Sequence, residues 1–325
     1  MATAPNGTVR AIAHPNIALA KYWGKKPGNG NVPAVPSLSV TLAGMATVTD
    51  LTFDEALGAD ALTLNGEPAR DDVLLRTVKL LDRVRALSGE TRRANVVSRN
   101  DFPTASGLAS SASGFAALAL AATHAAGMTT TPEEVAAIAR ESSASAARSL
   151  FGGFAELDTD GHARAVAPPT QLDLRVLVCV TTEAKKTIGS TTGMNETARK
   201  SLFYDAWLER APELHAEVKA ALLAKDFPRM GEAAETSALA MHGLAMAAGI
   251  VYFTPATTAA VAEVRKIRTG GTSCYATIDA GPHVKVLVLE KDREAVAARM
   301  KQVPGVLRIL ETQPGDAARI EAVSG

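Results

Sequence analysis

Cysteine is scarce in this chain: only Cys179 and Cys274 occur among its 325 residues. Each lies inside an apolar run typical of a buried strand, which favours free thiols in a reducing compartment over a disulfide framework. The sequence also shows no grouping of Cys and His with the spacing of metal ligands. We therefore predict no metal site built from protein ligands alone.

An excess of either charge is absent as well, because Lys plus Arg and Asp plus Glu both number 34. Nothing in this balance would hold a nucleic acid or suggest a solvated acidic tail. No apolar run is long enough to cross a membrane, and residues 1–10 lack a charged segment followed by an apolar one. We expect a cytoplasmic protein with a small-molecule substrate and neither a nucleic-acid nor a membrane partner.

What the chain does have is length and apolar content, with 325 residues of which 47% are hydrophobic. This length favours two domains, and an apolar run after the Pro168-Pro169 turn indicates where the second begins. We place the domains at 1–180 and 181–325. Strands interleaved with helices, and more helix in the second half, predict an α+β fold.

Local signals define several elements. Thr131, Pro132 and Glu134 form a capping-box pattern that starts a helix reaching about residue 142, and Asp71 is expected to cap an earlier helix. Alternation and β-branched content predict strands at 9–13, 38–42, 46–53, 94–98, 174–180, 274–278, 284–289 and 306–310. Helical spacing predicts later helices at 197–209, 212–224, 231–246, 256–267 and 292–301.

The most informative motif is the small-residue segment 103–113, which leads directly into an apolar helical stretch at 114–122. The first N–H groups of a helix lack intrahelical partners and carry the positive end of its dipole, and Gly and Ser let a phosphate approach them. Close packing of two elements is the alternative explanation. Neither the P-loop pattern nor a Gly-x-Gly-x-x-Gly after a strand is present.

Three further clusters carry charged groups. Lys21 and Lys25 flank Tyr22, Trp23 and a glycine. They could clamp an anion, or they could be the solvated end of a strand.

Arg148 ends a hydroxyl-rich helical segment, where its rigid fork of donors suits a carboxylate or phosphate but could also only cap carbonyls. Asp279 closes a strand before Gly281 and Pro282, and loops at strand ends often carry catalytic groups. An Asx-turn is the alternative for Asp279.

Taken in order, these segments resemble the mevalonate diphosphate decarboxylases of the GHMP kinase superfamily. The resemblance spans nearly the whole chain and is carried by residues 16–25, 103–113, 143–154, 185–194, 241–242 and 277–282. It implies a two-domain GHMP kinase fold, with an amino-terminal ATP-binding domain of a kind shared with ribosomal proteins and a ferredoxin-like carboxy-terminal domain. It also implies a homodimer.

The activity implied by the resemblance is ATP-dependent decarboxylation of mevalonate 5-diphosphate, which yields isopentenyl diphosphate, ADP, phosphate and carbon dioxide. A tertiary alcohol is a poor leaving group, so the family first transfers the γ-phosphoryl group of ATP to it. Phosphate then departs, positive charge develops at C3, and loss of the carboxylate quenches that charge. Mg²⁺ is expected with the nucleotide, as in phosphoryl transfer generally.

By matching motif positions, the resemblance assigns catalytic roles to four residues. Asp279 would orient or deprotonate the C3 hydroxyl, and Lys21 would neutralise phosphoryl charge beside it. Arg148 would hold the substrate carboxylate, and Ser190 would lie near the transferring phosphoryl.

The resemblance also assigns binding residues. The residues expected to bind the substrate, mainly its diphosphate end, are Tyr22, Trp23, Gly24, Lys25, Arg76, Ser143, Ala144, Ser145, Ala146, Ala147, Arg148 and Thr191. Those expected to bind ATP are Pro103, Ala105, Ser106, Gly107, Leu108, Ala109, Ser110, Ser111 and Ser113. The hydroxyls of Ser110 and Ser111 could also reach Mg²⁺.

Several positions depart from the family pattern: Ala20, Pro36, Ala144, Ala147, His283 and the segment 243–252, which faces the substrate in the family. These departures bear on the exact substrate. A phosphomevalonate decarboxylase and a mevalonate 3-kinase are the sibling alternatives, and the retained Asp279, Lys21 and Arg148 favour decarboxylation over the kinase reaction alone. A non-catalytic nucleotide-binding scaffold is the alternative from another class.

Overall fold

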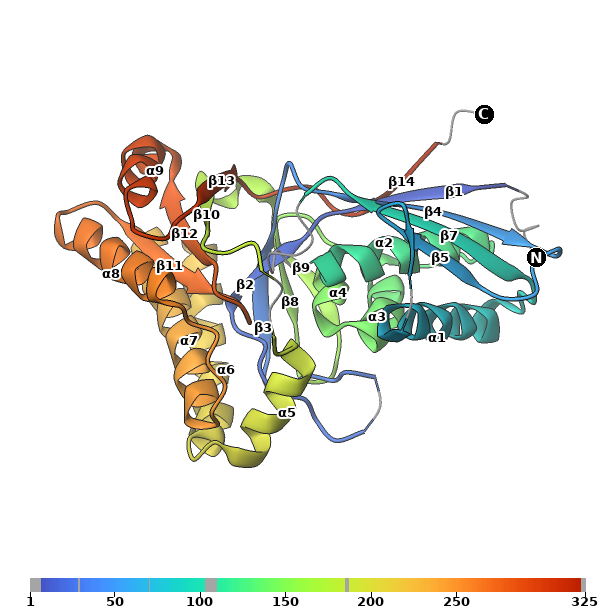
Figure 1. Ribbon diagram of the computed structural model, residues 1–325, viewed down its shortest axis with the longest axis horizontal. Coiled ribbons are helices and arrows are strands. Elements are labelled where there is room, and N and C mark those ends of the chain that lie inside the picture. The colour runs from blue at the N-terminus through green and yellow to red at the C-terminus, as the bar shows by residue number, and fades with distance from the viewer. Residues whose placement is uncertain (1–6, 29, 70, 103–109, 185–186, 323–325) are drawn as a thin grey trace.

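A computed structural model describes residues 7–28, 30–69, 71–102, 110–184 and 187–322. Figure 1 shows the first half of the chain on one side and most of the second half on the other, with β2, β3 and β8 between them, while β14 lies beside β1. No helix in these ranges is both long and apolar enough to cross a membrane. The expected α+β fold is confirmed by this mixture of three sheets and packed helices.

The first half contains two sheets. The larger has the strand order β14-β1-β4-β7-β5-β6, and all its pairs are antiparallel except β5 with β7. Its strands are β14 (Arg319–Glu321), β1 (Val9–Ala13), β4 (Thr47–Asp54), β7 (Arg93–Asn100), β5 (Ala61–Leu64) and β6 (Glu67–Pro68). The smaller sheet is β2 (Asn16–Ala20), β3 (Ser37–Thr41), β8 (Phe154–Leu157) and β9 (Ala163–Ala167).

The third sheet has the order β11-β12-β10-β13, with β11 (Cys274–Ile278), β12 (Val284–Leu289), β10 (Leu174–Val180) and β13 (Arg308–Thr312). By hydrogen bonding β10 belongs with the second half of the chain, and β14 returns to the first sheet. The boundary expected after residue 180 stays a prediction.

Among the described residues of the first half, four α-helices pack together: α1 (Asp71–Ser88), α2 (Ser110–Ala125), α3 (Pro132–Ser142) and α4 (Ala144–Arg148). The capping box predicted at Thr131 is confirmed, since its side chain accepts from the N–H of Glu134 and the Glu134 carboxylate accepts from the N–H of Thr131. α2 is largely buried and rich in alanine, which lets it lie close against β1 and β4. The side chain of Asp71 lies outside the described residues.

The second half carries α5 (Ser190–Lys200), α6 (Tyr204–Leu223), α7 (Phe227–Ala247), α8 (Pro255–Thr269) and α9 (Arg293–Lys301). The helices predicted at 197–209 and 212–224 are wrong in their division, because the chain breaks at 201–203 and α6 then runs through Pro212. Proline removes one backbone hydrogen bond there. Burial of the α6 face that includes Trp207, Ala211 and Val218 outweighs that loss.

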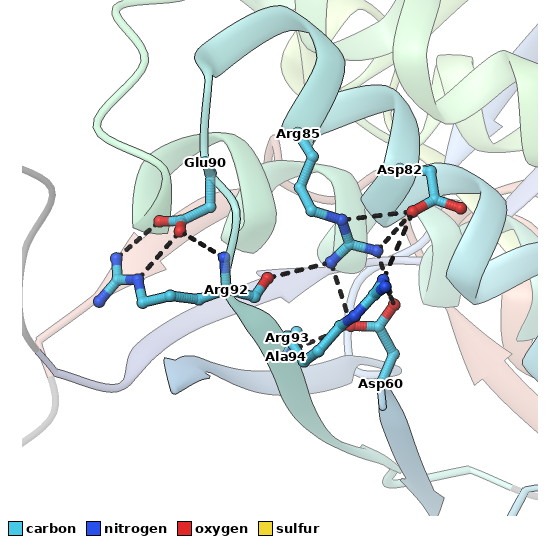
Figure 2. Close-up of polar contacts among 7 residues, drawn as sticks. All are labelled: Asp60, Asp82, Arg85, Glu90, Arg92, Arg93 and Ala94. Carbon is cyan, nitrogen blue, oxygen red and sulfur yellow. Dashed lines mark hydrogen bonds and ion pairs between the residues drawn. The ribbon is translucent and has the colours of Figure 1, made fainter. Parts of the chain in front are cut away.

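A charged network fastens α1 to the edge of the first sheet (Figure 2). Arg85 on α1 donates to Asp60 at 2.6 Å and to Asp82 at 2.7 Å, and Asp60 also accepts from the N–H of Ala94 on β7. The Asp60 side chain is buried, so these bonds satisfy a carboxylate removed from water. The network holds the helix that carries Arg76, two turns earlier in α1.

A second buried carboxylate, Glu156 on β8, joins the middle sheet to α6. Its carboxylate contacts His215 at 3.3 Å, Lys219 at 2.9 Å and Arg164 at 2.6 Å. These partners, His215 foremost, lower the pKa of Glu156 to about 2 against the opposing effect of burial. Because the folded pKa lies below that of the unfolded chain, the stabilisation is present above about pH 4.5 and is lost as the pH falls toward 2.

We expect Glu156→Gln to lower the free energy of unfolding by about 2 kcal/mol at pH 7, because a neutral amide replaces the charged acceptor that His215, Lys219 and Arg164 contact. Between pH 4.5 and pH 2 the free energy of unfolding of the variant should fall less than that of the parent, which urea unfolding across this pH range can measure. Glu196→Gln, which removes a partner of Arg199 and Lys200 at the surface, is the matched control and should change little. Equal effects of the two substitutions would contradict the assignment.

Candidate active site

One cleft of about 480 Å³ lies where segments from both halves of the chain meet. It is lined by Asn16, Ala18, Lys21, Tyr22, Trp23, Lys25, Asn31, Arg76, Ser110, Ser111, Ser142, Ser143, Ala144, Ser145, Arg148, Ser190, Thr191, Met194, Met241, Asp279 and Ala280. The four sequence clusters, which are far apart in the chain, therefore all contribute to one cavity.

Asp279 and Lys21 form the charged centre of the cleft. Lys21 Nζ donates to Asp279 Oδ1 at 2.7 Å, and Lys285 Nζ lies 3.2 Å from Asp279 Oδ2. Burial alone would raise the pKa of Asp279, but the two lysines more than offset it and hold that pKa below its ordinary value. Burial lowers the pKa of Lys21 to about 8 although Asp279 opposes the change, so at neutral pH the pair is ionised.

Hydrogen bonds between side chains and backbone groups of distant segments fix the position of Lys21 and Asp279. The Lys21 ammonium also donates to the carbonyl of Ala18 at 2.8 Å, and the Lys21 N–H donates to Ser237 Oγ on α7 at 3.0 Å. Thr277 Oγ1 on β11 donates to the same Ala18 carbonyl at 3.2 Å. The end of β11 is thereby tied to the end of β2, which places Asp279 beside Lys21.

Arg148 is a buried guanidinium held only by neutral groups. Its Nη1 donates to Ser37 Oγ at 2.7 Å, its Nε to Ser39 Oγ at 3.0 Å, and its Nη2 to Asn16 Oδ1 at 3.3 Å. No acidic side chain in the described part of the chain forms an ion pair with it, and burial lowers its pKa to about 10, so it stays charged. A desolvated cation at the wall of a cleft is suited to an anionic ligand.

A second group of donors lies farther along the cleft. Lys25 Nζ donates to Asn31 Oδ1 at 2.7 Å and to Thr191 Oγ1 at 3.2 Å, and burial lowers the pKa of Lys25. Arg76 stacks over the ring of Phe115 at 4.4 Å and donates from Nε to the carbonyl of Ser142 at 3.1 Å. These cations lie at the end of the cleft formed by α1, α3 and α5.

Two helices begin at the cleft. Ser110 and Ser111 open α2, and Ser190 opens α5, whose N-cap Gly189 provides no side-chain cap. The first turns of both helices therefore line the cavity, and the N–H groups of a first helical turn lack intrahelical partners. Of the predicted ATP loop, Pro103, Ala105, Ser106, Gly107, Leu108 and Ala109 lie outside the described residues.

Four other predicted site residues are described but do not line this cleft. Ser113 is buried and shares a 2.6 Å hydrogen bond with Thr47, while Ala146 and Ala147 pack in the hydrophobic core. Gly24 has φ +112°, and a Cβ there would clash with the Tyr204 hydroxyl, so its requirement for glycine comes from backbone conformation and packing. No contact with a ligand follows from these positions.

The structure adds residues that we did not predict from the sequence as members of the site. Asn16 and Asn31 supply amide groups, Ser37 and Ser39 hold Arg148, and Met194 and Met241 supply apolar wall. Ser37 and Ser39 alternate on one strand face, a pattern that could have suggested a shared partner. Asn31 has no comparable signal, because a loop brings it to Lys25.

The departures from the family pattern lie mostly behind the cleft. Among the described residues that line it, none comes from 243–252. Tyr252 packs edge-on against Trp23 with ring centres 6.1 Å apart, and so supports the wall indirectly. His283 is buried, and its Nδ1 accepts from the N–H of Thr181 at 3.2 Å, which fastens the loop after Asp279 to the end of β10.

A carboxylate paired with lysine, a buried arginine bonded to neutral groups, and two helix starts are suited to transferring a phosphoryl group to a small acidic molecule. With the three-sheet architecture, they define a two-domain enzyme of the GHMP kinase fold. Two family models match the chain: a diphosphomevalonate decarboxylase-like N-terminal domain over residues 13–167, and a mevalonate 5-diphosphate decarboxylase C-terminal domain over residues 176–318. The chain belongs to the mevalonate diphosphate decarboxylase family.

Individual relatives agree with this assignment. The chain is 36% identical to diphosphomevalonate decarboxylase mvd1 of Aspergillus fumigatus, over 89% of this chain and 79% of the relative. A phosphomevalonate decarboxylase of Haloferax volcanii is 34% identical, over 88% of this chain and 91% of the relative.

Solved structures are similar over nearly their full length. Mevalonate diphosphate decarboxylase from Staphylococcus aureus superposes with a TM-score of 0.92 at 36% identity, covering 97% of this chain and 98% of that one. The structure of MDDEF in complex with MVAPP, AMPPCP and magnesium has a TM-score of 0.91 at 36% identity, covering 97% and 99%.

Proposed function

We propose that this chain catalyses the ATP-dependent decarboxylation of mevalonate 5-diphosphate to isopentenyl diphosphate, ADP, phosphate and carbon dioxide. The observation that carries the proposal is the buried Arg148, which has no anionic ion-pair partner in the described chain and opens into the same cavity as Asp279 and Lys21. A substrate that bears both a carboxylate and a hydroxyl would meet Arg148 with one group and Asp279 with the other.

Each side chain then has a defined task. Asp279 orients the C3 hydroxyl and accepts its proton as the hydroxyl oxygen bonds to the γ-phosphorus of ATP, while ADP departs with the electrons of the broken P–O bond. Lys21 neutralises charge on the transferred group. Arg148 holds the carboxylate; the C3–O bond then breaks with its electrons leaving on phosphate, and the electrons of the bond to the carboxyl carbon form the new double bond as carbon dioxide is released.

The nucleotide would enter beside α2. A smaller hollow of about 160 Å³ shares Arg76, Ser110 and Ser111 with the cleft, and its other walls include Leu62 and Leu118. Its apolar walls suit a flat base, and the N–H groups at the start of α2 suit the phosphates.

Mg²⁺ would neutralise phosphate charge. No group of three His, Cys, Asp or Glu side chains in the described residues could hold a metal ion, and both oxygens of Asp279 already face lysines. The donor set therefore fits a magnesium ion held mainly by phosphate oxygens, with the hydroxyls of Ser110 and Ser111 within the same part of the cleft.

The two candidate substrates, mevalonate 5-phosphate and mevalonate 5-diphosphate, differ only in the phosphate group at C5. The cleft continues at Lys25 and Arg76 into an open hollow of about 920 Å³ whose basic residues also include Lys26, Lys79, Arg83 and Arg140. Among the described residues that line this hollow, the one acidic residue, Glu141, is paired with Arg83 at 3.3 Å. This excess of positive charge favours the diphosphate over the monophosphate, the substrate of the sibling enzyme.

We expect mevalonate 5-diphosphate to be turned over with kcat/KM at least about tenfold above that of the monophosphate, which corresponds to about 1.4 kcal/mol from the additional phosphate contacts. Release of ADP and carbon dioxide from each substrate with Mg-ATP measures this. Lys25→Met should reduce the preference, whereas Lys291→Met, a surface lysine outside the residues that line these hollows, should leave it unchanged. Turnover of only the monophosphate would identify the sibling activity, and ADP release without carbon dioxide would identify the 3-kinase.

We also propose that the enzyme is a homodimer that works in the cytoplasm. Cys179 and Cys274 are free, buried thiols, and burial raises the pKa of each, consistent with a reducing compartment. Light scattering coupled to size-exclusion chromatography tests whether the protein is a dimer.

The alternative from another class is a non-catalytic nucleotide-binding scaffold. It would be favoured if the protein released no ADP from Mg-ATP with any mevalonate derivative.

A further inference from the structure

Lys285 is a buried lysine in an otherwise apolar strand. Its neighbours on β12 are Val284, Val286 and Leu287, and the lysine side chain is only 2% exposed. Lys285 pairs in register with Thr277, the residue that ties β11 to β2 two positions before Asp279. A buried ammonium is costly to keep unless it acts on a specific partner.

That partner is Asp279. Lys285 Nζ lies 3.2 Å from Asp279 Oδ2, while Lys21 Nζ lies 2.7 Å from Oδ1, so each carboxylate oxygen has its own lysine. Lys21 lines the cleft and Lys285 does not. The carboxylate is thus held from the protein side by Lys285, and the face that remains 24% exposed is left to the substrate.

One lysine would suffice to balance the charge of Asp279, so the second must be explained by more than neutralisation. The other charged or titratable groups near Asp279 and Lys285 come from several elements: Lys21 after β2, Arg148 on α4, His242 on α7, His283 just before β12 and Arg308 on β13. Burial lowers the pKa of each histidine to about 4, so both are neutral at working pH. Lys285 is therefore the cation that acts on Asp279 from behind the cleft.

We propose that Lys285 is a positioning residue, which fixes the orientation and the negative charge of the Asp279 carboxylate so that the third N–H of the Lys21 ammonium can serve the transferred phosphoryl group. The proposal rests on the proposed function, in which Asp279 orients the C3 hydroxyl. Lys285 itself touches neither substrate nor nucleotide.

Lys285→Met tests this, because methionine keeps the length and removes the charge. We expect kcat at pH 7 to fall about tenfold or more with KM nearly unchanged, as for other groups that orient a reacting side chain from behind. Without Lys285 the burial of Asp279 is opposed by Lys21 and, more weakly, by Arg148, so the carboxylate takes up a proton at a higher pH. The acid limb of kcat should therefore move upward relative to the parent, while Lys285→Arg, which restores the charge, should keep the parent pH profile.

Lys219→Met is the matched control, since Lys219 pairs with the buried carboxylate of Glu156 away from the cleft. It should lower thermal stability without moving the pH profile of turnover. An unchanged profile in Lys285→Met, or an equal shift in Lys285→Arg and Lys285→Met, would overturn the proposal.

A second test measures thermal stability instead of turnover, and it can be made even if the single variant Lys285→Met does not fold. In Asp279→Asn the buried Lys285 loses its anion, so removal of the lysine as well should be favourable. The double variant Asp279→Asn with Lys285→Met should unfold at a higher temperature than Asp279→Asn, and a lower temperature would show that the two residues are not coupled in this way. An inactive parent enzyme would defeat the proposed function, but this thermal comparison would still decide the pairing.

Discussion

Replacement of Asp279 by asparagine is expected to abolish turnover and to leave substrate binding nearly intact. The amide keeps the shape of the side chain but cannot accept the hydroxyl proton or supply the negative charge that orients it beside Lys21. We expect kcat to fall by about 10³-fold or more, within the range for loss of a positioned acid–base group. The loss should appear in kcat and kcat/KM together, since the interaction belongs to the transition state.

Steady-state release of ADP and carbon dioxide, with calorimetric binding of the substrate, separates the two effects. Asp173→Asn is the control, because this exposed carboxylate pairs with Arg175 at the surface of the third sheet, away from the cleft. It should retain parental kinetics. An active Asp279→Asn enzyme would end the assignment of Asp279.

Replacement of Arg148 by lysine should be the second most damaging change. Ser37, Ser39 and Asn16 receive bonds from three different nitrogens of the guanidinium, and an ammonium cannot occupy those directions and also present a fork to a carboxylate. We expect about a 10²-fold loss in kcat/KM, since the carboxylate would no longer be held in the geometry from which carbon dioxide leaves.

The same assay, run beside thermal unfolding, decides this prediction. Arg164→Lys provides the comparison: Arg164 also pairs with a buried carboxylate, Glu156, but lies outside the cleft, so it should affect stability more than rate. Full activity of a folded Arg148→Lys enzyme would show that the substrate carboxylate is held elsewhere.

Local chemistry predicted much of the fold. The capping box at Thr131 and the apolar strand at 174–180 depend on neighbours within a few residues, and both are present as predicted. The division of the helices around Pro212 was wrong because tertiary burial of α6 outweighs a local breaking signal. β2 was not among the predicted strands, and a strand that ends near Lys21 was only an alternative, since the pairing of β2 with β3 is a contact between separate segments.

The candidate site also contains residues that the sequence predicted and residues that it did not. Motifs pointed to Asp279, Lys21 and Arg148, because unusual residue types stand together in short segments. Lys285 is marked in the sequence only by being a single charge in an apolar strand. Its role follows only from its contact with Asp279, which the sequence does not show.

The sequence by itself determined three properties of this chain: a small-molecule site, free cysteines, and a lysine, an arginine and an aspartate in the motifs of one family. These properties depend only on residue types and on short spacings between them. Only the tertiary structure decided which charges meet. Lys21 and Asp279 are 258 positions apart, and the pairing of their side chains depends on β2 and β11 being joined through the Ala18 carbonyl. Such a contact is fixed by packing of the whole chain, which no local segment encodes.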